Sequence, residues 1–172
     1  MYYSKLAIVA ALLIAAPASA GFDDHYIAGQ FTPFLQKAAT PGVSQSAQWI
    51  DGGGIVWGGK QARFVAVMTR IQLSKKLGGA GNWTLYLGEE FQFPFEINTG
   101  PVTVEVYPTI GIGPLISKVN DQVGFLNLSV PAGAGARIYL DNARTLFVGT
   151  VAQASLFDWP TWDLRLEFGG RY

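Results

Sequence analysis

The residues of this chain that could do chemistry are few and widely separated. His25 is the only histidine, and it follows Asp23 and Asp24, so it could act as a base or bind a metal ion. A histidine beside two carboxylates near the start of a chain is more typical of a solvated segment. Ser155 is a candidate nucleophile, but no cysteine is present, which excludes thiol catalysis, disulfides and Cys-ligated metal centres.

Glu89 and Glu90 form the most informative acidic pair. Adjacent strand residues point to opposite sides, so one of the two must depart from the pattern of its face. Glu89 falls among apolar residues near the middle of its predicted strand, where a carboxylate against lipid would be costly. That position would suggest a proton-linked or lipid-headgroup site. The alternative is a β-bulge at Gly88 that turns Glu89 inward or lifts it toward the membrane interface.

An alternation of apolar and polar residues positions these side chains. Between residues 82 and 97 the odd positions are mainly apolar and the even ones polar or small, as expected for a strand between two different environments. The alternation recurs at 102–112, 126–140 and 163–172, so one architecture is repeated. With the turn residues between these runs, it predicts an all-β, antiparallel up-and-down barrel with about eight strands, near 25–36, 46–57, 61–75, 83–97, 102–115, 124–140, 144–157 and 162–172.

The connections between these strands alternate in character. Tight turns are predicted at 58–60, 98–101 and 141–143, and looser connections at 37–45, 76–81, 116–123 and 158–161. This alternation of short and long connections is typical of outer-membrane barrels, whose tight turns face the periplasm. An even strand count puts both chain ends at the periplasmic rim. The aromatic residues at predicted strand ends agree: Trp83, Trp159 and Trp162 at the outer ends, Trp57 and Tyr172 at the inner ends.

Composition favours a membrane environment. Of the 172 residues 49% are apolar and 14% charged, which is low for a soluble surface. Twelve Lys and Arg balance twelve Asp and Glu, which argues against nucleic-acid binding. The alternative is a soluble lipocalin-like barrel that binds a ligand, with its apolar face turned inward.

In the membrane interpretation, charged residues face a narrow lumen. Eight strands leave just enough room for side chains, so these charges should pair and form a plugged polar core rather than a pore. The predicted inward charges are Arg70, Glu90, Glu96, Glu105, Arg137, Arg165 and Glu167.

The segment Met1–Ala20 has the features of a signal peptide. Lys5 precedes an apolar run from Leu6 to Ala16, and Ala18-Ser19-Ala20 fits the signal-peptidase rule. The run is too short to span a bilayer, and no later stretch could cross one as a helix. We therefore expect cleavage after Ala20, a barrel domain at 21–172 and residence in the outer membrane.

The closing strand LRLEFGGRY ends in an aromatic residue and alternates Leu164, Leu166, Phe168, Gly170 and Tyr172. Together with the signal peptide and the eight segments, it resembles the small eight-stranded outer-membrane barrels of Gram-negative bacteria. The resemblance implies that the barrel-assembly machinery reads the Tyr172 strand and that outer-membrane lipids surround the barrel. It indicates no particular family, and we expect a monomer.

Two families of barrel enzymes share this size. The segment GAGARIYLDN loosely resembles the lipid A deacylases, which use a His-x-Ser pair on the following strand, but the matching positions here are Gln153 and Ser155. An amide cannot act as a general base, so Ser155 lacks an activator. The lipid A palmitoyltransferases rely on a histidine with an Asp-Ser dipeptide, and this sequence contains no Asp-Ser dipeptide.

These patterns predict an outer-membrane barrel with a structural or interaction role and a closed polar lumen, not an open porin. They predict no cofactor and no metal site. The alternatives are a lipid A-modifying or other lipid-acting barrel enzyme, and the soluble ligand-binding barrel. Glu89, Glu90, Ser155 and His25 are the residues to test.

Overall fold

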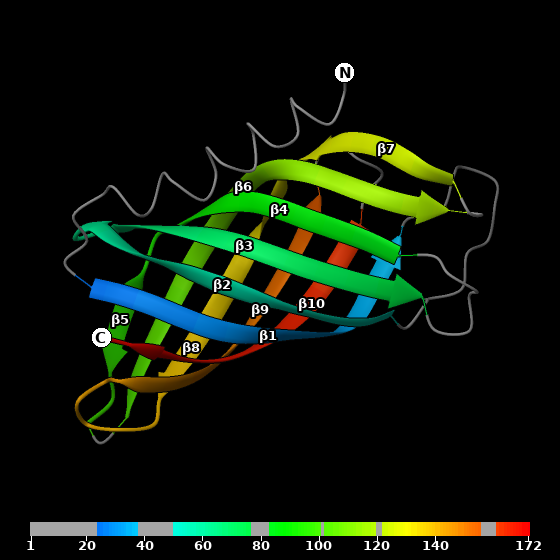
Figure 1. Cartoon of the computed structure of the whole chain (residues 1–172). Helices are drawn as coiled ribbons and strands as arrows, with labels where there is room; N and C mark the ends of the chain where they lie inside the picture. The colour runs from blue at the N-terminus through cyan, green and yellow to red at the C-terminus, as the bar shows by residue number, and fades with distance from the viewer. Residues whose placement is uncertain (1–23, 38–49, 77–82, 101, 120–121, 156–160) are drawn as a thin grey trace.

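One antiparallel sheet closes on itself to form the molecule (Figure 1). The computed structural model describes residues 24–37, 50–76, 83–100, 102–119, 122–155 and 161–172. The strands are β1 (Asp24–Lys37), β2 (Ile50–Ala62), β3 (Val65–Lys76), β4 (Trp83–Gln92), β5 (Phe95–Asn98), β6 (Thr103–Val119), β7 (Gln122–Ser129), β8 (Pro131–Tyr139), β9 (Leu146–Ser155) and β10 (Thr161–Arg171).

Two pairs of these segments are single barrel strands with a short interruption. Only Phe93 and Pro94 separate β4 from β5, and only Val130 separates β7 from β8, while all four segments pair with β6. Pro94 has no amide hydrogen and cannot complete the ladder. The Phe93 amide still donates to the Pro108 carbonyl at 3.0 Å, so the pairing with β6 continues across the interruption. The described segments therefore form eight barrel strands, as the alternation predicts.

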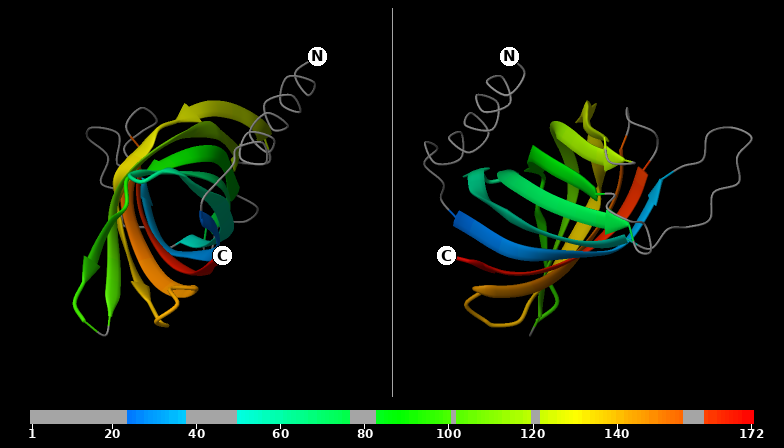
Figure 2. Two further views of the ribbon diagram at one scale, coloured as in Figure 1. Left: turned by 90° about the vertical axis from the view of Figure 1, so that its left-hand side faces the viewer. Right: turned by 45° about the vertical axis from the view of Figure 1, so that its right-hand side comes forward.

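Two pairings close the cylinder. β1 runs against β10 from Tyr26 opposite Arg171 to Lys37 opposite Thr161, and β4 runs against β6. The end-on view in Figure 2 (left) shows the resulting ring. Every neighbouring pair is antiparallel, so the barrel has the up-and-down topology expected from the sequence.

The two faces of the wall carry opposite chemistry. On β10, Leu164, Leu166 and Phe168 point outward and are 38%, 46% and 60% exposed, whereas Arg165 and Glu167 between them are buried in the interior. Apolar residues facing out and ions facing in are the arrangement of a transmembrane β-barrel. A soluble ligand carrier requires the reverse, so that alternative is wrong. Among the described residues, no helix is long and apolar enough to cross a membrane.

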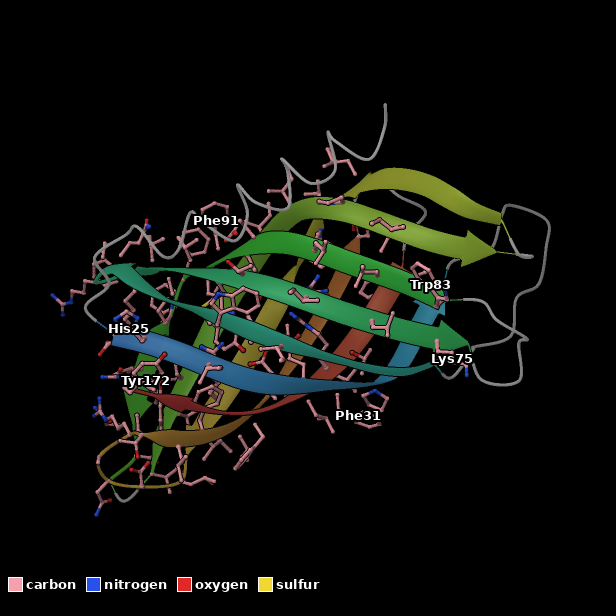
Figure 3. All side chains as sticks on the ribbon, viewed as in Figure 1. His25, Phe31, Lys75, Trp83, Phe91 and Tyr172 are labelled. Carbon is pink, nitrogen blue, oxygen red and sulfur yellow. The ribbon has the colours of Figure 1, made fainter. Side chains whose placement is uncertain are left out.

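The barrel has two distinct rims (Figure 3). The first described strand begins and the last one ends at the terminal rim, where His25 and Tyr172 exchange backbone hydrogen bonds of 2.9 Å and stack their rings 5.5 Å apart. The opposite loop rim carries Lys75 and Trp83. The start of β1 and the end of β10 share one rim, as an even strand count predicts, and Trp83, Trp162 and Tyr172 lie at the predicted strand ends.

The first tight turn lies further along the chain than the sequence predicts. β2 continues through Gly58 and Gly59 to Ala62, and the chain turns at Arg63 and Phe64. Gly58 serves close strand approach, because a Cβ there would run into the backbone of Val67 on β3. The predicted turn at 58–60 is therefore wrong, and Trp57 lies within its strand rather than at the end.

The connection predicted at 116–123 is mostly strand. β6 extends to Val119 and β7 begins at Gln122, because polar residues beyond an apolar belt can still pair through their backbones. The connections predicted at 37–45, 76–81 and 158–161 fall largely outside the described residues, as do Trp159 and the predicted signal peptide Met1–Ala20.

Close strand approach at the β4–β6 closure leads to a testable prediction. A Cβ on Gly113 would run into the carbonyl oxygen of Leu87 and the Cα of Gly88. We expect Gly113→Ala to lower the free energy of unfolding by about 1–3 kcal/mol, because backbone must shift to admit the methyl group. Urea unfolding of the barrel in lipid vesicles measures the loss.

The matched control is Gly53→Ala on β2. A Cβ at Gly53 meets its nearest neighbour, the Gln30 carbonyl oxygen, at an ordinary 3.6 Å. Its unfolding midpoint should stay close to that of the unmodified chain. Equal urea midpoints for the two variants would show that the β4–β6 pairing can accommodate a methyl group at residue 113 without loss of stability.

Candidate functional site

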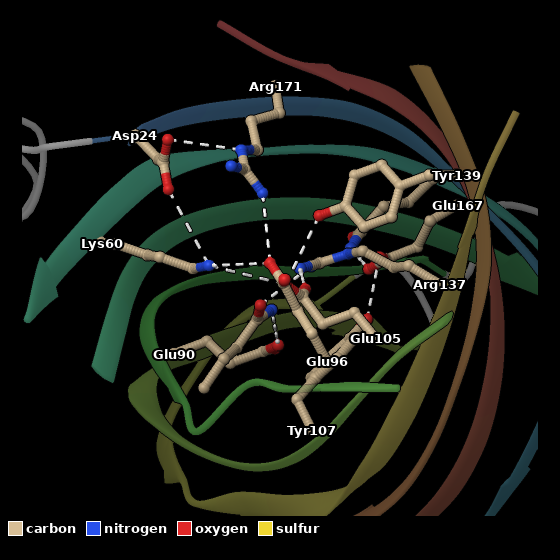
Figure 4. Close-up of polar contacts among 12 residues, drawn as sticks. Asp24, Lys60, Glu90, Glu96, Glu105, Tyr107, Arg137, Tyr139, Glu167 and Arg171 are labelled. Carbon is tan, nitrogen blue, oxygen red and sulfur yellow. Dashed lines mark hydrogen bonds and ion pairs between the residues drawn. The ribbon is translucent and has the colours of Figure 1, made fainter. Parts of the chain in front are cut away.

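A buried arginine organises the barrel interior toward the terminal rim (Figure 4). Arg137 of β8 is 1% exposed. Its Nη1 donates to Glu105 Oε1 at 3.0 Å, its Nε to Glu167 Oε2 at 3.4 Å and its Nη2 to Gln92 Oε1 at 2.8 Å. Three other strands, β6, β10 and β4, thus supply its partners. One cation therefore links four parts of the wall across the lumen.

Aromatic rings surround this guanidinium. Its Cζ lies 4.2 Å from the ring centroid of Tyr107 and 5.0 Å from that of Phe147. The Tyr107 hydroxyl donates to Glu167 Oε2 at 3.1 Å, so the same tyrosine supports the cation and one of its anions. Cation–π contacts are strongest where water is excluded, as here.

A second ionic cluster is centred on Glu90 of β4. Its Oε2 lies 3.2 Å from Arg70 Nη1 and 3.1 Å from Arg165 Nη2. Gln92 Nε2 donates to Glu90 Oε1 at 2.9 Å and so joins this cluster to that of Arg137. Asp163 Oδ1 adds a longer ion pair, 3.8 Å from Arg165 Nε. Opposite charges thus neutralise one another through the middle of the barrel.

A third cluster lies at the terminal rim. Lys60 Nζ is 3.8 Å from Asp24, 3.6 Å from Glu96 and 3.8 Å from Glu105, so it connects the rim to the interior. Arg171 of β10 pairs with Asp24 at 3.3 Å and with Glu96 at 3.4 Å. These pairs join the first and last strands to β2 and β5.

The predicted interior charges are mostly placed as expected, with one exception. Glu96 points toward Lys60 and Arg171 but lies at the terminal rim, and its side chain is 27% exposed. The prediction of a lumenal Glu96 is therefore corrected, because β5 lies beyond the last β3–β4 pair, Ala66 opposite Gln92. The other six are buried inside: Arg70, Glu90, Glu105, Arg137, Arg165 and Glu167.

Several members of the network are not identified by the sequence pattern alone. The sequence pattern places Lys60 in a tight turn, whereas it lies in β2 and its Nζ reaches three carboxylates. Gln92 and Tyr107 occupy the inward phase of their strands, and that phase was the signal that could have identified them. The hydrogen-bond partners of these two side chains lie on other strands and are known only once the barrel has closed.

Glu89 lies on the outer face of the wall. The β3–β4 register runs without a shift from Ala66 opposite Gln92 to Lys75 opposite Trp83, so the β-bulge considered at Gly88 is not formed. Glu89 is paired with Thr69 of β3, whose Oγ1 donates to Glu89 Oε1 at 2.9 Å. Gly88 instead makes room for the Tyr86 hydroxyl, which a Cβ would strike.

The structure does not bring the candidate residues together. His25 lies at the terminal rim, whereas Ser155 lies at the far end of β9, with its Oγ 3.2 Å from Ser129 Oγ. Gln153, which the loose resemblance to the lipid A deacylases matches to their histidine, accepts from Arg165 Nη2 at 3.0 Å and donates to Asp163 at 2.8 Å. Within the described ranges, no group of three or more His, Cys, Asp or Glu residues could hold a metal ion.

The turn between β8 and β9 is held by one carboxylate. Asp141 Oδ1 accepts from the Leu146 amide at 2.9 Å and the Thr145 amide at 2.8 Å, and Oδ2 accepts from the Thr145 hydroxyl. These bonds, led by the one from Leu146, lower the pKa of Asp141. The turn is the last of the three tight connections at the terminal rim.

This lowered pKa predicts an acid-sensitive contribution to stability. Because the folded pKa of Asp141 lies below the unfolded value of about 4, the contribution is present above that value and is lost as pH falls through the folded pKa. We expect Asp141→Asn to be less stable than the unmodified chain near neutral pH and equal to it in acid. Unfolding midpoints across pH test this, and a difference that persists in strong acid would contradict it.

Comparisons with known proteins support the fold. No family model and no curated protein sequence matches the chain. Among solved structures, it is similar to Neisserial surface protein A (TM-score 0.57, 8% identity, 86% of this chain and 95% of that one). It is also similar to Ail, the attachment invasion locus protein of Yersinia pestis (0.57, 14%, 88% and 100%), and to the N-terminal β-barrel domain of Pseudomonas aeruginosa OprF (0.55, 12%, 88% and 99%). At these identities the likeness shows the fold of small outer-membrane barrels.

Proposed function

We propose that this protein is an outer-membrane barrel with a closed polar lumen and a structural or interaction role, rather than an open pore. The observation that carries the proposal is the ionic network centred on Arg137, whose partners come from three other strands. An eight-stranded barrel is only wide enough for its own side chains. The paired charges of Glu90, Arg70 and Arg165 occupy the lumen between the Arg137 cluster and the loop rim.

The same proposal assigns an orientation. The terminal rim, with its tight turns, faces the periplasm, and the loop rim faces outward, as in outer-membrane barrels generally. Export uses the predicted signal peptide, cleaved after Ala20, and assembly uses the closing strand that ends at Tyr172. Outer-membrane lipids cover the apolar belt. The loop rim is then the surface available to partners outside the cell.

Planar-bilayer conductance tests the closed lumen. The purified barrel should show no stable open level, because water and ions would have to displace buried ion pairs. Removing the central cation and its anions together, as Arg137→Ser with Glu105→Ser and Glu167→Ser, should raise conductance. Arg144→Ser, which removes a cation from the β8–β9 turn, is the matched control and should stay silent. Uniform open steps from the unmodified protein would overturn the proposal.

Fractionation with a heat-modifiability gel tests the location separately. The protein should remain with outer membranes and change mobility on boiling, because a folded barrel migrates differently from its unfolded chain. Release with periplasmic contents after osmotic shock would contradict residence in the membrane.

A further inference from the structure

Glu96 is the meeting point of three cations at the terminal rim (Figure 4). Lys60 Nζ lies 3.6 Å and Arg171 Nη1 3.4 Å from its Oε1, while Arg144 Nη1 donates to its Oε2 at 2.6 Å. The cations come from β2, from β10 and from the turn between β8 and β9, whereas Glu96 lies on β5. One carboxylate therefore joins four parts of the rim.

These ion pairs cross the opening of the lumen at the terminal rim, which we call the terminal mouth. In the sheet, β3 separates β4 and its continuation β5 from β2, while β6, β8 and β9 separate β5 from β10. Asp24 contacts two of the same cations, Lys60 at 3.8 Å and Arg171 at 3.3 Å, but it lies on β1, the direct neighbour of β2 and β10. Asp24 thus holds these cations on their own side, whereas Glu96 links that side to β5.

The β8–β9 turn adopts an unusual backbone conformation where it reaches Glu96. Arg144 has a φ of 57°, a left-handed conformation that residues other than glycine rarely adopt. From there its Nη1 contacts Glu96 and its Nη2 donates to Asn98 Oδ1 at 3.1 Å, both on β5. Backbone strain of this kind persists where the surrounding contacts hold it, so the turn and β5 form one fixed contact.

The layer just inside the terminal mouth is shielded from water. Lys60 also lies 3.8 Å from Glu105, whose side chain is 0% exposed. Ala66, opposite Lys60 on β3, is buried in an apolar cluster that includes Tyr139 and Phe147. Lys60 therefore connects the partly exposed Glu96 with the buried interior.

We propose that Glu96 is a latch that closes the terminal mouth and opens when its carboxylate is neutralised. With Glu96 ionised, β5 and the β8–β9 turn are held to Lys60 and Arg171. With Glu96 neutral, both cations keep Asp24 as a partner, and β5 is released from the opposite side. The latch rests on the proposed closed lumen and regulates access to it from the terminal side.

Acid is the expected trigger of the latch. Partial burial raises the pKa of Glu96, but Lys60, Arg144 and Arg171 outweigh that effect and lower it overall. A carboxylate with a lowered folded pKa keeps its contacts above the ordinary value of about 4 and loses them as pH falls through the folded value. The latch should therefore be closed near neutral pH and open only in acid.

The other acidic and titratable groups of the rim have contacts of their own. Asp24 and Glu105 act on Glu96 through Lys60, which both of them contact. Asp141 accepts hydrogen bonds within its own turn, and the His25 ring stacks on Tyr172. Substituting Glu96 alone therefore separates its titration from theirs.

A cysteine placed under the latch tests the proposal, because the chain has none of its own. Ala66→Cys puts a thiol opposite Lys60, and Asn142→Cys puts a reference thiol on the exposed β8–β9 turn. Full barrels in lipid vesicles are treated with dithiodipyridine, a small neutral disulfide. Relative to the reference, Ala66→Cys should react slowly at neutral pH and several-fold faster once Glu96→Gln is added. With Glu96 intact the relative rate should rise below about pH 4, whereas with Glu96→Gln it should be high throughout.

Asp24→Asn is the matched control, because it removes a carboxylate that contacts two of the same cations without crossing the mouth. It should leave the Ala66→Cys rate low at neutral pH. The heat-modifiability gel confirms that each variant is folded; if Glu96→Gln fails to fold, the pH series with Glu96 intact decides. An unchanged rate in Glu96→Gln, an equal acceleration in Asp24→Asn or a flat pH series would overturn the latch.

Conductance separates the latch from the closed lumen. The Arg137 cluster lies deeper than Glu96 and keeps its partners in Glu96→Gln, so this variant should stay silent in planar bilayers. Failure of the closed lumen therefore appears as open steps from the unmodified protein, and failure of the latch appears in the thiol rates.

Discussion

Replacing Arg137 with methionine should lower the free energy of unfolding by about 3–5 kcal/mol, because Glu105 and Glu167 would be left as buried charges without their shared cation. Methionine nearly fills the space, so the loss reports on charge rather than on a cavity. Tyr107 would also lose the cation above its ring. Urea unfolding in lipid vesicles, followed by tryptophan fluorescence, measures the change.

A rim arginine provides the matched control. Arg144 pairs with Glu96 and Asn98 at the terminal rim, where water screens the charges. Its replacement by methionine should cost at most about 1 kcal/mol. If the two methionine variants unfold at the same urea concentration, the interior pairs do not stabilise the barrel as argued.

Neutralising the anions should restore part of the loss. In a chain that carries Arg137→Met with Glu105→Gln and Glu167→Gln, no unpaired charge remains in that cluster, although some hydrogen bonds are lost. We expect this triple variant to be more stable than Arg137→Met alone. A triple variant that is less stable would mean that the hydrogen bonds, and not charge balance, hold this part of the lumen.

The alternation of residue types was sufficient to predict the wall of the barrel. Successive side chains of a strand point to opposite faces, so the apolar positions of β10 and the charges between them divide the same way in sequence and in space. Turns were less predictable, because glycine serves both tight turns and close strand approach. Gly58 belongs to the second class, although it looks like the first.

The partners within the lumen could not be predicted, because they depend on how the sheet closes. Arg137 meets Gln92 although the two are far apart in sequence, and Lys60 meets Glu96 across the rim. Strand stagger decides which inward residues share a level, and it was not available from residue types. The orientation of Glu89 likewise followed only from the unbroken β3–β4 register.

A charge placed on the outer face should reveal the membrane around the barrel. Leu166→Arg on β10 puts a guanidinium near the middle of the apolar belt and should cost about 2–4 kcal/mol in lipid vesicles. Trp162→Arg, on the same face of the same strand but at the loop rim, should cost only about 0–1 kcal/mol, because a charge there reaches the headgroups. The difference measures depth, since both positions are exposed and neither contacts the ionic network. Equal costs at the two positions would mean that no hydrocarbon layer surrounds β10, and the transmembrane interpretation would fail.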